Sequence, residues 1–249
     1  MQLNGRTVLV TGGARGIGLE LTRQFVAEGA HVVAVGRDRS SLARLQFAAP
    51  SQVSCWALDL ADPKATDAFI RDLPGRHPTL SVVVNNAGMQ TLTDFMAEDP
   101  AALRPALQEE IALNFEAVVA VSTGLLPHLR RQPSAMIVNV TSGLALAPKT
   151  SSPVYCATKS AVRTFTKALR YQCEDGAPSV RVMEAVMALV DTDMTAGRGS
   201  GKISPAQAAG EVIAAIKRDR AEVYVDRAKL LPILMRVAPG FGERLMRRG

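Results

Sequence analysis

Residues 7–18 read TVLVTGGARGIG, a short β-branched apolar run that passes directly into a turn with four glycines. The run predicts a buried strand, and the apolar spacing after Gly18 predicts a helix. Between a strand and a helix, such glycines permit a tight turn and let the backbone approach a phosphate group at the helix N-terminus. The spacing is not GxGxxG, and many such turns use glycine only for positive φ angles. The turn alone therefore leaves nucleotide binding and plain turn geometry equally open.

Short apolar runs alternate with amphipathic segments along the rest of the chain. We predict further strands at residues 31–35, 53–58, 80–84, 136–140, 180–186 and 222–225. The alternation predicts a Rossmann-like, doubly wound α/β fold, with a mostly seven-stranded parallel sheet and helices on both faces. No linker or repeat divides the chain, so we expect one domain over residues 1–249. A basic helical extension is expected around residues 228–249, interrupted by Pro232 and by Pro239-Gly240.

The composition favours a globular protein of the cytoplasm. Hydrophobic residues make up 47% of the chain and charged residues 21%, and we find no run near the roughly 20 apolar residues of a membrane-spanning helix. The cysteines, Cys55, Cys156 and Cys173, show neither CxxC nor Cys/His ligand spacing, so we expect no metal site and a reducing compartment. Cys156 invites a redox role only if its thiol is exposed and its pKa is low.

Positive charge gathers at the C-terminal end. The chain has a formal net charge of +6, and residues 217–249 contain nine Lys/Arg against four Asp/Glu. A basic tail can favour nucleic acid or an anionic membrane, but no base-reading motif or interleaved aromatic residue accompanies this one. We expect no nucleic-acid partner and a mostly solvated tail. For residues 230–246 we prefer packing within the chain or at a subunit interface over contact with a membrane surface.

The end of the second predicted strand bears on nucleotide choice. It reads Val35-Gly36-Arg37, and Gly36 stands where a fold specific for NAD often places an acidic residue against the ribose 2′-hydroxyl. Arg37 and Arg15 can make charge-assisted hydrogen bonds to a 2′-phosphate, so NADP is preferred over NAD. The alternative, two merely solvated arginines, stays open because Asp38 follows directly.

Tyr155 and Lys159 are four residues apart in a segment with helical spacing, so both project from one face. A nearby ammonium group stabilises phenolate and is expected to lower the tyrosine pKa toward the range of a general acid/base. On its own, such a pair is more often a surface cation–π contact than a catalytic site. The surrounding sequence changes this balance.

The chain resembles the short-chain dehydrogenase/reductase family, single-domain type, and is similar to its DltE-type bacterial subgroup. The resemblance rests on residues 11–18, Asp59-Leu60, residues 85–88, Asn114, Ser142, residues 155–159 and residues 190–194. It implies that Ser142 binds the substrate oxygen, Tyr155 exchanges its proton, Lys159 holds the nicotinamide ribose, and Asn114 holds a proton-relay water. The expected nucleotide-binding residues combine those implied by the resemblance with Arg15 and Arg37, which were argued above from their charge. They are Thr11, Gly12, Arg15, Gly16, Ile17, Gly18, Arg37, Asp59, Leu60, Asn86, Ala87, Gly88, Tyr155, Lys159, Val190 and Thr192.

The resemblance implies an NADP(H)-dependent oxidoreductase that transfers a hydride between nicotinamide and a carbonyl or secondary alcohol. A catalytically silent nucleotide sensor on the same fold is the alternative. The expected partners are a small-molecule substrate and further copies of the chain in a homodimer or homotetramer. Met187-Ala188 replaces the family's usual Pro-Gly, so the loop beside the nicotinamide departs from the pattern. Met89, Met187 and Met194 are candidates for the substrate lining, although core packing is the preferred role for each.

Overall fold

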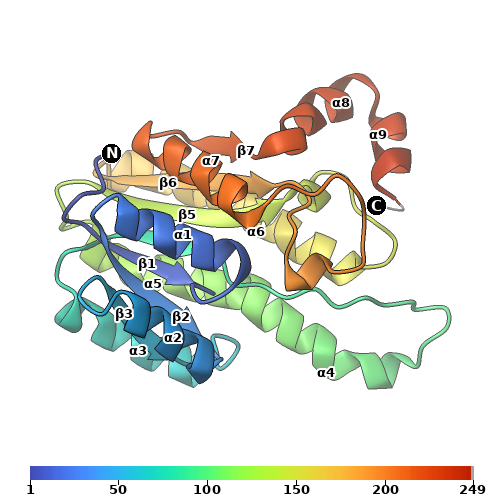
Figure 1. The fold of residues 1–249 in the computed structure, drawn as a ribbon. Coiled ribbons are helices and arrows are strands. Elements are labelled where there is room, and N and C mark those ends of the chain that lie inside the picture. Colours follow the sequence, from blue (N-terminus) through green and yellow to red (C-terminus); the bar gives the residue numbers. More distant parts are fainter. Residues whose placement is uncertain (248–249) are drawn as a thin grey trace.

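A seven-stranded, entirely parallel sheet forms the centre of the molecule, with the strand order β3-β2-β1-β4-β5-β6-β7 (Figure 1). The computed structural model describes residues 1–247. The strands are β1 Thr7–Thr11, β2 His31–Gly36, β3 Val53–Ala57, β4 Leu80–Asn85, β5 Ala135–Ser142, β6 Val180–Met187 and β7 Glu222–Tyr224. This confirms the predicted doubly wound sheet, and every predicted strand lies within two residues of an observed one.

Helices cover both faces of the sheet (Figure 1). The helices are α1 Gly16–Ala27, α2 Arg39–Ala48, α3 Pro63–Arg76, α4 Pro100–Ile111, α5 Ala117–Leu129, α6 Pro153–Gly176, α7 Pro205–Lys217, α8 Leu231–Val237 and α9 Pro239–Met246. One apolar core joins α1 and α7 to the sheet, and a second joins α3, α5 and α6 to the opposite face. The inner strands β1, β2, β4, β5 and β6 are buried on both faces, which is why their sequences are continuous apolar runs.

The order of the strands reverses between β1 and β4. Ligands of open α/β sheets bind outside the carboxyl ends of the strands at such a switch point. The glycine turn after β1, the residues after β4 and the end of β5 therefore meet at one edge of the sheet.

A buried polar network fastens the helices to the middle of the sheet. The Asn85 side-chain amide donates to Ser122 Oγ at 2.9 Å and to Asn139 Oδ1 at 2.8 Å, and Asn139 donates to Thr166 Oγ1 at 2.9 Å. All four residues are at most 3% exposed. Asn85 is thus a structural residue of the Asn-Asn-Ala-Gly segment, and its side chain does not face the sheet edge.

One helical run is longer and more apolar than the sequence analysis expects. Residues 100–129 form a continuous run of α4, a π-helical turn η1 (Ala112–Glu116) and α5, which is long and apolar enough to cross a membrane by length and composition alone. The apolar residues of its second half, Leu113, Val121, Leu125 and Leu129, pack in the core between α3, α6 and the sheet. Burial against the sheet accounts for the apolar character of this half.

The C-terminal segment forms a helical hairpin beyond β7. A 3-10 turn η4, Asp226–Leu230, leads into α8, and α9 packs back against α8. The predicted interruption at Pro232 is wrong. Pro232 lies in the first turn of α8, where a backbone nitrogen needs no hydrogen-bond partner within the helix. The predicted break at Pro239-Gly240 is confirmed at Ala238, between the two helices.

Candidate active site

The glycine turn presents the N-terminus of α1 at the sheet edge. Gly16 has φ +54°, and a Cβ atom on Gly18 would collide with the carbonyl oxygen of Gly12. The cap residue of α1, Arg15, makes no side-chain capping bond, and no acidic residue lies in the first turn. The first backbone N–H groups of α1 thus have no acceptor from the side chain of the cap residue. Gly12 and Gly18 are so close that neither a Cβ atom nor a longer side chain fits between them. This arrangement fits a nucleotide pyrophosphate.

Thr11 joins the glycine turn to the segment after β4. Its hydroxyl accepts from the backbone N–H groups of Asn86 at 2.9 Å and Ala87 at 3.0 Å, and its carbonyl accepts from the Asn86 side chain at 3.0 Å. These hydrogen bonds occupy the polar groups of Thr11 and Asn86, and they hold the segment after β4 beside the glycine turn. Leu60 is 6% exposed and belongs to the core, so its side chain does not face a nucleotide.

Arg37 lies at the end of β2 between two carboxylates. Its guanidinium is 2.6 Å from Glu109 Oε1 and 3.4 Å from Asp59 Oδ2, and these partners raise its pKa further. All three side chains are more than 40% exposed, so the ion pairs are weak and a stronger anion can replace them. Asp38 caps α2 by accepting from Ser40 and Ser41. That carboxylate is therefore engaged, while Arg15 is exposed beside Gly16.

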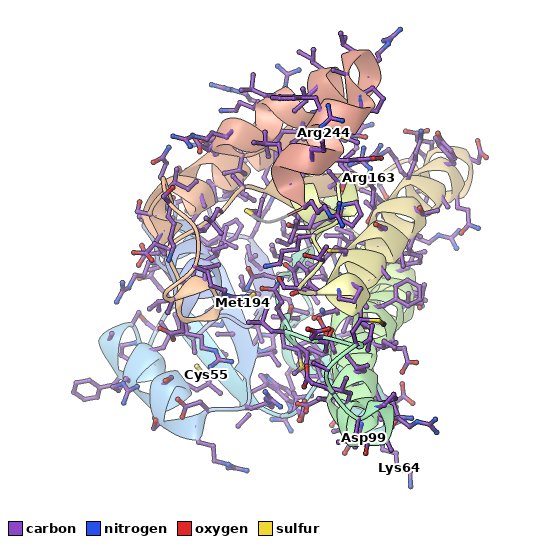
Figure 2. The ribbon with its side chains drawn as sticks, turned by 90° about the vertical axis from the view of Figure 1, so that its right-hand side faces the viewer. Cys55, Lys64, Asp99, Arg163, Met194 and Arg244 are labelled. Atoms are coloured by element: carbon purple, nitrogen blue, oxygen red, sulfur yellow. The ribbon has the colours of Figure 1, made fainter. Side chains whose placement is uncertain are left out.

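The segment after β6 closes the other side of the glycine turn. A Cβ atom on Gly16 would lie 3.4 Å from Thr192 Cγ2, so Thr192 lies beside the glycine turn. Val190 is 3% exposed and packs in the core, which leaves only its backbone for a ligand. Met187 is also buried in the core rather than in a substrate lining, whereas Met194 is 36% exposed. Met194 projects near the middle of the view in Figure 2.

Ser142, Tyr155 and Lys159 come together where β5 ends and α6 begins. Ser142 is the last residue of β5, and Tyr155 and Lys159 lie in the first two turns of α6. Lys159 Nζ donates to the carbonyl of Val140 at 3.0 Å and lies 5.7 Å from the centre of the Tyr155 ring. With only 4% exposure, Lys159 is part of the site interior and not of a surface cation–π pair.

Burial controls the protonation of this pair. Burial raises the pKa of the Tyr155 phenol to about 12, against an opposing effect of its hydrogen bond with Ser142. Burial also lowers the pKa of the Lys159 ammonium to about 8, against the opposing charge of Glu110. The expected lowering of the tyrosine pKa is wrong for this structure, because loss of solvent outweighs charge stabilisation of the phenolate. Tyr155 is held as a neutral phenol, a proton donor.

Asn114 lies in the π-helical turn and joins the site to the segment after β4. Its side chain donates to the Met89 carbonyl at 2.9 Å and accepts from the Met89 N–H at 2.9 Å. It also donates to Thr158 Oγ1 at 3.3 Å. Single π-helical turns are frequent at functional sites, and this one directs Asn114 toward Tyr155 and Lys159. A Cβ atom on Gly88 would lie 3.1 Å from Asn114 Oδ1 and 3.5 Å from Lys159 Nζ, so only glycine leaves this space free.

Sequence reasoning missed Glu110 and Arg198. Glu110, one helical turn before Asn114, is fully buried, and one of its oxygens has no hydrogen-bond partner among residues 1–247. Burial raises its pKa, and the charge of Lys159 opposes this rise. Arg198, in the segment after β6, donates to the Gln90 side chain at 2.6 Å and so bridges two walls of the site. Glu110 could have been found from its position four residues before Asn114, which places the two side chains on one side of a helix. Nothing in the sequence pairs Arg198 with Gln90.

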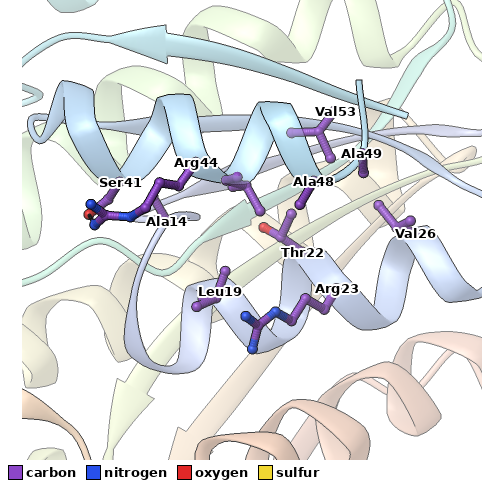
Figure 3. A pocket seen from close by; sticks show the side chains of 11 residues that line it. Ala14, Leu19, Thr22, Arg23, Val26, Ser41, Arg44, Ala48, Ala49 and Val53 are labelled. Carbon is purple, nitrogen blue, oxygen red and sulfur yellow. Dashed lines mark hydrogen bonds between the residues drawn. The ribbon is translucent and has the colours of Figure 1, made fainter. Parts of the chain in front are cut away.

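Two other features lie apart from this chemistry. Cys156 is 3% exposed and burial raises the pKa of its thiol, so it lacks the exposure and low pKa of a redox-active cysteine. A cavity of about 400 Å³ lies between α1 and α2 and is lined by Ala14, Leu19, Arg23 and Arg44, among others (Figure 3). It contains none of the residues around Tyr155.

Comparisons with known proteins agree with this geometry. A family model described as short chain dehydrogenase matches residues 6–202. The chain belongs to the short-chain dehydrogenase family. This short-chain dehydrogenase is 40% identical over 194 residues to the uncharacterized oxidoreductase DltE of Bacillus subtilis, a match that covers 78% of the chain and 75% of the relative. The resemblance to the family and to its DltE-type members is confirmed. The protein is an NAD(P)-dependent oxidoreductase of CH–OH and C=O groups.

Solved structures share the fold of this short-chain dehydrogenase along nearly its whole length. One from Burkholderia cenocepacia, in complex with NADP, has a TM-score of 0.85 and 24% identity and covers 99% of both chains. Another from Burkholderia phymatum, in complex with NAD, also has a TM-score of 0.85, with 19% identity, and covers 100% of this chain and 98% of its own. The same fold therefore accepts either nucleotide, and the choice depends on local residues.

Proposed function

We propose that this short-chain dehydrogenase is an NADP(H)-dependent carbonyl reductase or alcohol dehydrogenase with Tyr155 as its general acid/base. The observation that carries the proposal is the convergence of Ser142, Tyr155 and a buried Lys159 at the carboxyl edge of the sheet. This edge also holds the glycine turn that fits a pyrophosphate. The proposed substrate is a small molecule with a carbonyl or secondary alcohol.

The side chains divide the work on the substrate oxygen. Ser142 and Tyr155 each offer a hydroxyl that donates a hydrogen bond and so stabilises negative charge developing on that oxygen. Because Tyr155 is a neutral phenol, it delivers its proton to the oxygen in the direction of reduction. The nicotinamide, when bound, supplies or accepts the hydride.

Lys159 and Asn114 keep this acid in place and supplied with protons. The Lys159 ammonium stabilises the phenolate that remains after proton transfer, and Lys159 would also hold the nicotinamide ribose of a bound nucleotide. Asn114, held by Met89 and Thr158, provides the fixed amide that a relay water needs. Thr158 also donates to the Tyr155 carbonyl at 2.9 Å, which ties the first turn of α6 to this network.

The preference for NADP rests on Arg37 and Arg15. A 2′-phosphate at the end of β2 would replace two weak, exposed carboxylate contacts of Arg37 with a stronger bidentate one. Gly36 leaves space there, since a Cβ atom at this position would meet nothing within 4 Å. The Asp38 carboxylate accepts from Ser40 and Ser41 at the start of α2 and makes no ion pair with Arg37, so this guanidinium remains available to the phosphate.

The proposal is tested by NADPH oxidation at 340 nm across a panel of aldehydes, ketones and diketones, with alcohols and NADP in reverse. We expect turnover by the native protein and a loss of at least about a hundredfold in Tyr155→Phe. Tyr171→Phe is the matched control, because Tyr171 lies on the same helix and is 52% exposed. Tight NADPH binding without turnover of any substrate would favour the sensor alternative, and a failure to bind either nucleotide would refute the proposal.

A further inference from the structure

The C-terminal hairpin, residues 226–247, carries an apolar stripe on its outer surface. The stripe consists of five large side chains at 56–77% exposure: Leu230, Ile233, Val237, Phe241 and Leu245. Leu230, the N-cap residue of α8, precedes Ile233 and Val237 of that helix at spacings of i, i+3 and i+7, and the other two lie on α9 at i and i+4, so each set lies on one side of its helix. Isolated exposed apolar residues are ordinary, but five of them at helical spacing on two helices that pack together indicate an interaction surface.

The hairpin is anchored to the body of the molecule by its opposite side. Leu231 and Met246 pack with Leu146, Ala188 and Tyr224 beside the end of β6. Gly242 lets the two helices meet closely, since a Cβ atom there would lie 2.7 Å from Met235 Sδ. At the end of the hairpin, the Arg247 carbonyl accepts from both the N–H and the hydroxyl of Thr150 at 3.0 Å. The stripe is therefore held outward on a fixed element.

Basic residues border the stripe. Residues 226–247 contain five Lys/Arg and two acidic residues, Asp226 and Glu243. Given the helical period of 3.6 residues, Arg236 and Arg244 fall about a quarter turn from the stripe on α8 and α9. Both are exposed, and neither has an acidic partner within salt-bridge distance among residues 1–247. Figure 2 shows Arg244 on the hairpin, at the opposite end of the view from Lys64 and Asp99.

We propose that residues 226–247 are a docking element for an anionic phospholipid surface, on which the stripe enters the headgroup boundary while Arg236 and Arg244 bind lipid phosphates. Apolar residues on one side with basic residues at the margin are the pattern of helices that lie in a membrane interface. A second copy of the chain is a poorer occupant, because symmetric pairing would bring these arginines together with almost no acidic residues to face them. The contact is peripheral and goes beyond the proposed activity. It departs from the packing preferred on sequence grounds for residues 230–246, because the stripe is exposed in the described part of the chain.

The inner side of the hairpin borders the loop between the two catalytic residues. Its anchor, Thr150, lies between Ser142 and Tyr155, and Leu231 touches Gly143 directly after Ser142. Because the stripe is on the opposite, exposed side of the hairpin, a bound bilayer would be separated from this loop by the two helices.

The test is co-sedimentation of the full chain with vesicles of phosphatidylcholine alone and of phosphatidylcholine mixed with phosphatidylglycerol. We expect binding to the anionic vesicles that weakens on adding salt, and little binding to the neutral ones. Replacing the stripe, as Ile233→Ser, Val237→Ser and Phe241→Ser together, is expected to lower partitioning about tenfold or more. Arg236→Gln with Arg244→Gln is expected to lower it about fivefold for each arginine and to remove the preference for anionic lipid.

The matched control is Phe47→Ser on α2, which removes an 89% exposed aromatic side chain outside the hairpin and is expected to leave partitioning unchanged. NADPH binding and circular dichroism check that each variant is folded. Native protein that ignores anionic vesicles, or a folded stripe variant that still binds them equally, would overturn the proposal. So would a native oligomer that dissociates on replacing the stripe, because the second copy would then be the occupant.

Discussion

At Lys159, burial and a neighbouring carboxylate act in opposite directions on one ammonium group. Its pKa of about 8 means that the group is charged below that pH and neutral above it. Since the charge stabilises the phenolate left by Tyr155, we expect kcat/KM for carbonyl reduction to fall as the pH rises through about 8. The Tyr155 phenol, with a pKa of about 12, stays protonated over this range.

The control for this pH profile is Glu110→Gln. It removes the negative charge that raises the Lys159 pKa, so the descending limb is expected to move to lower pH, with the maximum rate largely retained. A profile that is flat up to 10.5, the ordinary lysine value, would contradict the role assigned to Lys159.

Arg37 is the residue on which the nucleotide preference depends. We expect Arg37→Ala to weaken NADPH binding about tenfold, since one exposed charge-assisted contact is lost, and to leave NADH binding nearly unchanged. Fluorescence titration with both nucleotides measures the ratio, and Arg44→Ala on α2 serves as an exposed control. Equal loss for the two nucleotides would show that Arg37 does not select the phosphate.

At the scale of the element, the segment from Asp193 to Ile203 is fixed near its ends, by Thr195 and Ile203, and reaches the site through Arg198. It holds a single 3-10 turn, and Arg198 bonds to Gln90 across the site. We expect NADPH with a substrate analogue to protect residues 193–203 from limited proteolysis, because closure excludes water from hydride transfer. Arg198→Gln is expected to reduce this protection, and cleavage that is unchanged by ligands would count against a closing segment.

The sequence predicts the strands well and the details around the site less well. Parallel strands buried on both faces give continuous apolar runs, so β1 to β6 can be read directly from residues such as Val8, Val32 and Val82. The interruption predicted at Pro232 is wrong, because a helix tolerates proline in its first turn and the residue at which α8 begins depends on packing. The tyrosine pKa was predicted in the wrong direction because burial of Tyr155 arises from contacts distant in sequence.

At the scale of the whole molecule, the network of Asn85, Ser122, Asn139 and Thr166 joins the layers of the fold. Asn85→Leu would remove the donor to two buried oxygens, Asn139 Oδ1 and Ser122 Oγ, so we expect the free energy of unfolding to fall by about 2 kcal/mol. Urea denaturation measures the change. Gln46→Leu, on the exposed surface of α2, is expected to have almost no effect, and a similar loss there would refute a specific role for the network.

The bond between Thr150 and Arg247 has a practical consequence for handling the protein. A fused partner that displaces Arg247 would break this bond and free the loop between Ser142 and Tyr155. The N-terminus lies at the other end of the sheet, where the Met1 ammonium donates to the Lys217 carbonyl at 2.8 Å, far from the candidate active site (Figure 1). We therefore expect fusion at the N-terminus to preserve KM, and fusion near Arg247 to raise it when the bond to Thr150 is lost.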